Sequence, residues 1–335
     1  MKTVTLGRTR LVVSQVGFGA LPIQRVPSPE AEQLIRKAYT RGVRFFDTAR
    51  FYSDSEEKLG RALEDVRTNV VLATKTMATD RATANEQLST SLRNLRTDYV
   101  DIIQLHNPEA LPNPTDRNSA YAALVDAREA GVVRHLGLTN HRLELARTGV
   151  LSGMFDTLQF PLSYLSTPEE LELIEICRDN NVGLIAMKAL AGGLLTNIPA
   201  AFAFLRRFDN LVPIWGIQSE SELDEFLALD AACPELTLEL EQAISDDRRD
   251  LGTAFCRGCG YCLPCPAEIP IHWAARMPQL LRRAPTDGFL SPHWQQQMAR
   301  IDECTECLAC ASRCPYQLDT PQLLKAALTD YRTFL

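Results

Sequence analysis

The 335-residue sequence has no apolar run long enough to cross a membrane, so we expect no transmembrane segment. Its first residues lack the long apolar stretch and the small-residue cleavage site of a secretion signal. Positive charge is not in excess either. The formal net charge of −7 at pH 7 argues against nucleic acid or an anionic membrane as a partner. Together these absences predict a cytoplasmic protein.

The glycine fingerprint G-x-G-x-x-G of doubly wound dinucleotide-binding domains is also missing. Gly17-Phe18-Gly19 follows an early apolar run, but the chain continues Ala-Leu-Pro, with no third glycine and with a proline that obstructs a helix. A doubly wound sheet is therefore the weaker of the two architectures considered below.

Short β-branched runs alternate with amphipathic segments before residue 256, which is typical of βα units around a parallel sheet. After an N-terminal hairpin we expect eight strands, at residues 16–19, 44–48, 70–74, 100–105, 135–138, 157–160, 183–187 and 212–216. The intervening helices include segments 30–41, 84–95, 118–130 and 168–180. Eight strand–helix units in about 200–250 residues predict an α/β fold of the (β/α)8 TIM-barrel type.

The composition changes after the eighth strand, where the chain becomes helical, arginine-rich and rich in cysteine. We therefore predict a barrel domain over residues 1–233 and a mostly helical, ferredoxin-like iron–sulfur domain over 234–335. Within the second domain, helices are expected at 271–283 and 292–301.

Cysteine is abundant, and eight of the ten cysteines form two runs that each end in Cys-Pro. Without a signal peptide, this content points to reduced thiols or metal ligands and away from disulfides. Three thiolates at two-residue gaps, with a fourth before proline, match the ferredoxin pattern for a [4Fe–4S] cluster. The runs consist of Cys256, Cys259, Cys262 and Cys265, and of Cys304, Cys307, Cys310 and Cys314.

In two-cluster ferredoxins, the last cysteine of each run binds the cluster of the other run. We therefore expect one cluster on Cys256, Cys259, Cys262 and Cys314, and a second on Cys304, Cys307, Cys310 and Cys265. The first run has two residues before its last cysteine where the pattern has three, so that ligand is less well determined. Structural zinc is the alternative, since paired C-x-x-C sequences also form zinc sites with four cysteine ligands.

Polar residues interrupt the apolar runs where catalytic groups of a barrel are found, at the C-terminal ends of strands. Asp47 ends the second strand and Tyr52 follows it, Lys75 ends the third, and His106 ends the fourth. A lysine at a strand end is notable here because arginine supplies most of the basic charge.

In these segments the chain resembles the aldo/keto reductase superfamily, in order along residues 1–230. The matching positions also include Glu57 and Gly60, and the tail resembles that of a branch with a ferredoxin-like module. The resemblance implies that Tyr52 donates a proton to a carbonyl oxygen and that Lys75 lowers the pKa of its hydroxyl. Asp47 would pair with the lysine, and His106 would orient the carbonyl.

The resemblance also implies that a nicotinamide nucleotide, NADP or NAD, binds at the same face. Thr139, Asn140 and Gln159 would hold its carboxamide. The further candidates follow the seventh and eighth strands and are Met187, Lys188, Leu190, Gly216 and Gln218. Met187 replaces the usual stacking aromatic, and the family's usual cation for the 2′-phosphate is not evident, so the choice between NADP and NAD stays open.

We therefore predict an oxidoreductase that reduces small-molecule carbonyls or oxidises alcohols and that passes electrons through two [4Fe–4S] clusters, with a redox protein as a possible partner. The alternative is a redox-sensing or regulatory barrel that binds nucleotide, in which the clusters, or structural zinc, take no part in turnover.

Overall fold

The computed structural model describes residues 1–335 except 194, 252–255, 259, 261, 284–285 and 315. The chain divides into two compact units. The first comprises Met1–Ala191 with Thr196–Thr237, and the second comprises Gly192–Leu195 with Leu238–Leu335. The domain boundary predicted between residues 233 and 234 lies just before Leu238, where the main segment of the second unit begins.

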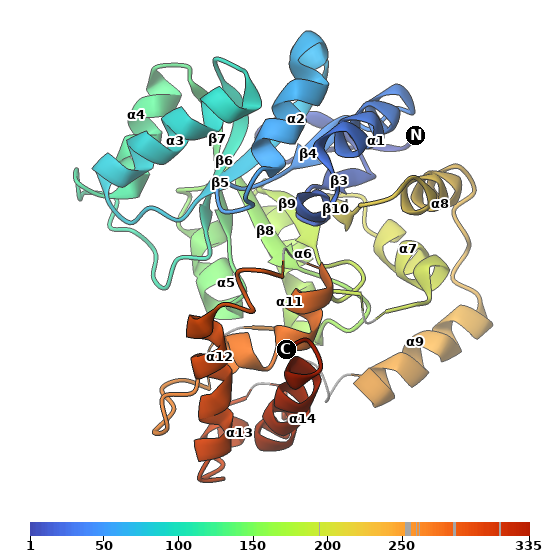
Figure 1. Cartoon of the computed structure of the whole chain (residues 1–335). Helices are drawn as coiled ribbons and strands as arrows, with labels where there is room; N and C mark the ends of the chain where they lie inside the picture. The colour runs from blue at the N-terminus through green and yellow to red at the C-terminus, as the bar shows by residue number, and fades with distance from the viewer. Residues whose placement is uncertain (194, 252–255, 259, 261, 284–285, 315) are drawn as a thin grey trace. The chain divides into compact units, whose positions relative to one another are not determined.

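The first unit is a closed barrel in which neighbouring strands run parallel, in the order β10-β3-β4-β5-β6-β7-β8-β9 (Figure 1). Its strands are β3 (Gly17–Gly19), β4 (Phe45–Asp47), β5 (Val71–Thr76), β6 (Val100–His106), β7 (Val133–Thr139), β8 (Thr157–Pro161), β9 (Gly183–Met187) and β10 (Leu211–Gly216). From β4 to β9, each strand pairs with the strands before and after it in the chain, and β10 closes the ring on β3. The predicted TIM barrel is confirmed.

The helices of this unit follow the strands, as the βα pattern predicts. They are α1 (Ser28–Thr40), α2 (Ser55–Leu63), α3 (Arg81–Leu95), α4 (Ala120–Glu129), α5 (Leu143–Leu151), α6 (Pro168–Asp179), α7 (Ile198–Arg206) and α8 (Glu220–Ala231). At Gly60, a Cβ atom would lie 2.1 Å from the carbonyl oxygen of Asn94. Only glycine therefore allows α2 to approach the end of α3 this closely.

An N-terminal hairpin of β1 (Thr3–Thr5) and β2 (Val12–Ser14) packs on one end of the barrel. Its buried side chains, such as Val4 and Val13, share a core cluster with Phe45 and Val212, which lie in the first halves of their strands. The hairpin therefore closes the N-terminal end of the barrel and leaves the catalytic face at the opposite end.

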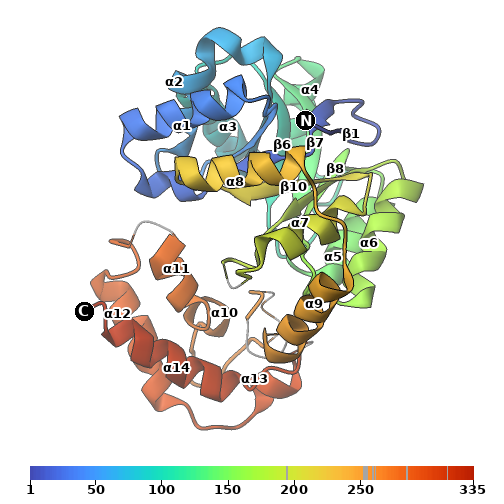
Figure 2. The same cartoon turned by 90° about the vertical axis from the view of Figure 1, so that its right-hand side faces the viewer.

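The second unit is helical. Its helices are α9 (Leu238–Leu251), α10 (Ile271–Ala274), α11 (Met277–Arg283), α12 (Pro292–Ala299), α13 (Ala309–Ser312) and α14 (Thr320–Arg332). The last helix contacts each of α10, α11, α12 and α13 (Figure 2). The core of this unit is formed by side chains that include Ile271, Met298, Leu324 and Tyr331, and several of the cysteines pack against it.

One predicted helix is corrected by the structure. The segment 271–283 is not continuous but breaks after Ala274 and begins again at Met277. Pro278 explains the break, because it has no N–H to donate to the carbonyl of Ala274 four residues earlier. Proline is tolerated in the first turn of a helix, where no such bond is needed, and α11 begins there.

Among the described residues, no helix combines the length and the hydropathy that a membrane span requires.

Candidate functional site

The end of β4 and the neighbouring strand β5 place a buried ion pair inside the barrel. The ammonium of Lys75 donates to both carboxylate oxygens of Asp47 and, over 2.7 Å, to the carbonyl oxygen of Thr48. Both charged side chains are 1% exposed. Burial raises the pKa of Asp47, and the charge of Lys75 opposes that shift. The pair is fixed in one geometry by its own hydrogen bonds.

Tyr52 lies in the turn between β4 and α2, next to this ion pair. The Nζ atom of Lys75 is 5.2 Å from the centroid of the Tyr52 ring. The ring also meets His106 edge-on, with centroids 5.9 Å apart and an interplanar angle of 83°. The structure therefore brings all four predicted catalytic residues, Asp47, Tyr52, Lys75 and His106, together at the C-terminal ends of three successive strands.

His106 is the last residue of β6, and its imidazole is kept uncharged. Burial lowers its pKa to about 3, and the nearby charge of Lys75 acts in the same direction. Its Nδ1 atom is buried and has no hydrogen-bond partner among the described residues. The imidazole is therefore neutral at physiological pH.

Three side chains on neighbouring strands form an amide network behind the ion pair. Gln159 donates to Asp47 over 3.2 Å and accepts from Gln104 over 2.8 Å. The hydroxyl of Thr139 donates to the same Gln104 over 2.8 Å. Two of the predicted nucleotide-binding residues, Thr139 and Gln159, are thus linked to the catalytic carboxylate.

The loop after β7 holds Asn140, the third residue predicted to bind the carboxamide. Its amide donates to the carbonyl oxygen of Pro108 over 3.0 Å, and its side-chain oxygen accepts from the backbone N–H of Arg142 over 2.8 Å. Lys188, which follows β9, lies with its Nζ 3.4 Å from Nδ1 of His141 in the same loop. The β7 and β9 loops therefore meet at these residues.

The remaining predicted nucleotide contacts follow the paired strands β9 and β10. Met187 ends β9 and is almost fully buried, while Leu190 is half-buried in the following turn. Gly216 ends β10 and is exposed, opposite Gly19 of β3. The backbone N–H of Gln218 donates to the carboxylate of Glu222 over 2.8 Å.

In the second unit, the cysteines border two hollows. One is lined by Cys265, Cys304, Cys307 and Cys310, together with Cys262. The other is lined by Cys256, Cys262 and Cys314, with Arg257 and Tyr316 beside them. Cys259 lies outside the described residues. Cys265 thus lies with three cysteines of the second run and Cys314 lies with Cys256 of the first, while Cys262 borders both hollows.

The described neighbours of the second cysteine have similar backbone angles in the two runs. The residue before it has a positive φ in each run, 73° at Gly258 and 52° at Glu306, and so does the residue after it, 84° at Gly260 and 57° at Leu308. Left-handed residues in such loops turn successive N–H groups toward one side, a form that recurs around anions and iron–sulfur clusters. In the first run, the N–H of Gly258 donates to the sulfur of Cys256 over 3.4 Å. The described residues of both runs therefore have a backbone form that is compatible with a cluster.

The described cysteines of this unit are not arranged as a site for a single metal ion. Among the described residues, no three cysteine, histidine or carboxylate side chains are placed to hold one metal ion. The pKa of the Cys307 thiol is lowered, chiefly by the backbone N–H of Ala309, which favours the thiolate that binds iron. Cys307 is exposed, whereas the other described run cysteines are half-buried.

Comparison with known proteins decides the family. The aldo/keto reductase family profile matches residues 15–227. The chain belongs to the aldo/keto reductase family. A profile for a 4Fe-4S dicluster domain matches residues 255–319, so the aldo/keto reductase barrel is followed by a 4Fe–4S domain.

Curated relatives match part of the chain. L-galactose dehydrogenase of Arabidopsis thaliana is 33% identical in an alignment of 213 residues, and the match covers 57% of this chain and 66% of the relative. The NADH-specific methylglyoxal reductase of Escherichia coli (strain K12) is 28% identical over 226 residues, covering 58% of this chain and 69% of the relative. The chain thus spans about two thirds of the length of these relatives.

Solved structures agree on the fold. An aldo-keto reductase from Bacillus halodurans in its holo form has a TM-score of 0.65 at 22% identity, and the match covers 73% of this chain and 96% of that one. An aldo-keto reductase from Klebsiella pneumoniae in complex with NADPH has a TM-score of 0.61 at 22% identity, covering 74% and 94%. The barrel is that of an aldo/keto reductase.

Sequence reasoning missed one residue of the hydrogen-bond network at this candidate site. Gln104 joins Gln159 to Thr139, although in the sequence it stands out only as part of a strand end. Its position two residues before His106 was the available signal, since alternate residues of a strand face the same side. A polar residue on the interior side of a buried strand needs partners there.

Proposed function

We propose that this aldo/keto reductase catalyses nicotinamide-dependent reduction of small-molecule carbonyls, or the reverse oxidation of alcohols, with Tyr52 as the proton donor. The observation that carries the proposal is the ammonium of Lys75 beside the Tyr52 ring, held by the buried carboxylate of Asp47. A bound nicotinamide nucleotide would supply the hydride, and the residues of the chain would manage the charge on the carbonyl oxygen.

The hydroxyl of Tyr52 is a weak acid by itself, because a phenol with the ordinary pKa of about 10 is a poor proton donor at neutral pH. The adjacent positive charge of Lys75 favours the phenolate and makes the hydroxyl a stronger acid. Asp47 holds the ammonium in place and is itself held by Gln159. In the reverse direction, the same arrangement stabilises Tyr52 as the base that accepts the alcohol proton.

His106 is suited to orienting the carbonyl and not to protonating it. Because its pKa is about 3, it carries no extra proton to give at neutral pH. A neutral imidazole still has one N–H, and we infer that Nε2 donates it to the carbonyl oxygen, since Nδ1 is buried without a partner among the described residues. This leaves proton delivery to Tyr52.

We propose that the nicotinamide carboxamide binds near Thr139, Asn140 and Gln159. The rest of the nucleotide would extend along the ends of β9 and β10, past Met187, Lys188, Leu190, Gly216 and Gln218. Relatives offer both cofactors, since one is named NADH-specific and another was solved with NADPH. We therefore propose NADP or NAD without choosing between them.

We further propose that the second unit holds two [4Fe–4S] clusters, one on Cys256, Cys259, Cys262 and Cys314 and one on Cys265, Cys304, Cys307 and Cys310. The two hollows and the repeated loop form support this division. Such clusters supply one-electron chemistry. The exposed Cys307 would then be a place where a redox protein exchanges electrons with the clusters.

Cluster content is tested by purifying the protein without oxygen. We expect iron and sulfide in equal amounts and a brown colour with broad absorbance near about 400 nm. A colourless protein with stoichiometric zinc would contradict the clusters and support a structural metal site.

The carbonyl-reductase proposal is tested by Tyr52→Phe, which removes only the hydroxyl. We expect aldehyde reduction by NADH or NADPH to fall by about 100-fold or more, since that is the scale of general acid catalysis, while nucleotide binding is retained. A wild type without turnover across a broad aldehyde and ketone panel would instead favour a sensing role for the barrel.

A further inference from the structure

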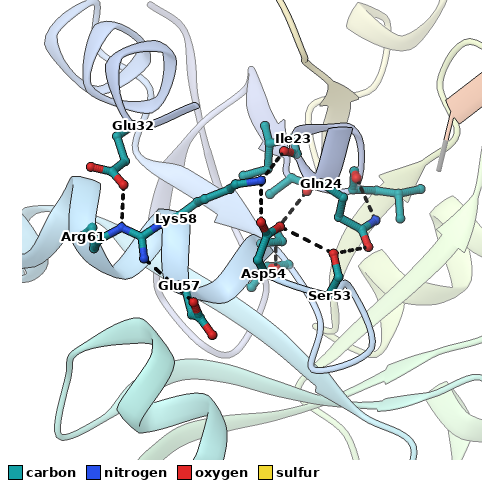
Figure 3. A network of polar contacts seen from close by, with 12 residues as sticks. Ile23, Gln24, Glu32, Ser53, Asp54, Glu57, Lys58 and Arg61 are labelled. Atoms are coloured by element: carbon teal, nitrogen blue, oxygen red, sulfur yellow. Dashed lines mark hydrogen bonds and ion pairs between the residues drawn. The ribbon is translucent and has the colours of Figure 1, made fainter. Parts of the chain in front are cut away.

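A second lysine near the catalytic turn is buried, although nothing above gives it a role. Lys58 lies on α2 and is 1% exposed. Lysine is almost never this deeply buried unless its charge is paired. Its ammonium pairs with Asp54 over 2.8 Å and donates to the carbonyl oxygen of Ile23 over 2.9 Å (Figure 3).

The two partners of Lys58 belong to different loops on the catalytic face. Asp54 lies two residues after Tyr52, in the turn between β4 and α2. Ile23 lies in the short 3-10 helix Pro22–Arg25, which follows β3. A single buried ammonium therefore ties the turn that carries Tyr52 to the preceding loop.

A hydroxyl strengthens the same connection. Ser53 donates to the side-chain oxygen of Gln24 over 3.0 Å, and Gln24 donates to the carbonyl oxygen of Leu21 over 2.9 Å (Figure 3). Ser53 directly follows Tyr52 and has a φ of 26°, outside the range that non-glycine residues prefer. Such a residue persists only where its surroundings hold it in place.

The turn is held in a similar way at its other end. There the ammonium of Lys75 donates to the carbonyl oxygen of Thr48 over 2.7 Å while it pairs with Asp47. The segment from Thr48 to Asp54 is thus fixed by a buried lysine at each end, with Tyr52 between them. Lys75 faces the Tyr52 ring, whereas the partners of Lys58 are an adjacent carboxylate and a neighbouring loop.

We propose that Lys58 is a positioning residue for the proton donor: by holding Asp54 and Ile23 it fixes the turn that places Tyr52 against Lys75 and His106. The inference rests on the proposed function of Tyr52. A displacement of about 1 Å in a catalytic group can cost about 100-fold in rate. The clamp that Lys58 forms with Asp54 and Ile23 therefore affects turnover, although none of its groups touches the substrate.

The test uses the full-length, cluster-loaded protein and Lys58→Met, which keeps most of the length of the side chain and removes its charge. In hydrogen exchange, we expect amides of segment 48–55 to exchange about 10-fold faster, while those of β5 stay as in the wild type. With an aldehyde substrate, kcat should fall about 10-fold or more, with the Kd for NADH or NADPH within about twofold.

Two variants serve as controls. Lys37→Met removes a lysine of α1 that pairs with Glu220 and Asp224, away from the turn, and should change neither readout. Asp54→Asn keeps an oxygen that accepts from the Lys58 ammonium, so it should retain more of the wild-type kcat than Lys58→Met does.

The outcomes separate a positioning role from a purely structural one. If Lys58→Met lowers the unfolding temperature but leaves the exchange of segment 48–55 and kcat unchanged, the proposal is wrong. If Lys58→Met does not fold, Asp54→Ala removes the same pair from its outer side and must show the same local exchange. If the wild type reduces no carbonyl, the proposed function fails, and hydrogen exchange alone still shows whether the clamp exists.

Discussion

The barrel site and the cysteine module differ in what holds their functional groups in place. In the barrel, Lys75, Asp47 and Gln159 hydrogen-bond directly to one another. In the second unit, the described cysteines of the two runs border two hollows. The barrel side chains are thus held by hydrogen bonds within the chain, whereas we propose that the cysteines are held in place by the clusters that they bind.

Removal of iron tests this difference most strongly. When a chelator strips the clusters, we expect hydrogen exchange in residues 304–314 to accelerate by about 100-fold or more, because metal binding contributes on the order of 10 kcal/mol in small metal-dependent domains. Exchange in β5 and β6 should stay unchanged, since those strands hold their site without metal. Equal loss of protection in both regions would contradict the comparison.

Removal of the ion pair between Asp47 and Lys75 tests how the barrel site is held together. Lys75→Met leaves the carboxylate of Asp47 buried without its partner, so we expect a loss of about 3–5 kcal/mol in the free energy of unfolding. The kcat/KM for an aldehyde should also fall by about 10²–10⁴-fold, because Tyr52 loses its activating charge. Urea unfolding and steady-state kinetics measure the two effects.

The matched control for this prediction is Lys37→Met, whose lysine pairs with exposed carboxylates at the surface. It should leave kcat/KM as in the wild type. A loss of activity in this control equal to that of Lys75→Met would show that any change of lysine on the barrel is harmful, and the specific role of Lys75 would be contradicted.

The neutral state of His106 predicts a pH dependence of stability. The folded state holds its pKa at about 3, and the unfolded chain has a His pKa near 6.5, so below pH 6.5 the unfolded state binds more protons. Stability should therefore fall as pH drops from 7 to 5, by about 1–2 kcal/mol from this residue alone. His106→Asn should lose correspondingly less, as measured by urea unfolding at both pH values with equal cluster content. Identical pH slopes would contradict the assignment.

The smallest predicted effect concerns the strained loop of the second cysteine run. Leu308 has a φ of 57°, where the first run has glycine at the equivalent position. Leu308→Gly should relieve that strain and stabilise the module by about 0.5 kcal/mol, after the greater freedom of glycine in the unfolded chain is counted. Leu308→Ala keeps the strain and should show no gain in thermal unfolding of the module. Equal behaviour of the two variants would argue against a strained position.

The fold and the clustering of the four candidate catalytic residues were largely predictable because each depends on local pattern. Strand ends are visible as polar residues after apolar runs, and consecutive barrel strands are neighbours, so Asp47 and Lys75 had to lie close together. The helix break before Met277 was overlooked because the apolar pattern continues across it, although Pro278 was a visible signal.

Hydrogen bonds and ion pairs that join different loops could not be predicted from the sequence. Nothing in the residues around Lys58 shows that its ammonium turns inward to Asp54 and Ile23, since a lysine on a helix is normally solvated. In the same way, the link between Lys188 and His141 depends on how two loops meet, which no periodicity encodes.

Carbonyl reduction by the barrel, with Tyr52 as the proton donor, is the central claim. The most direct test compares the wild type with Tyr52→Phe in steady-state reduction of an aldehyde by NADH or NADPH. The proposed function predicts turnover by the wild type and a rate lower by about 100-fold or more in the variant, with nucleotide binding retained. Equal turnover by the two proteins would contradict it.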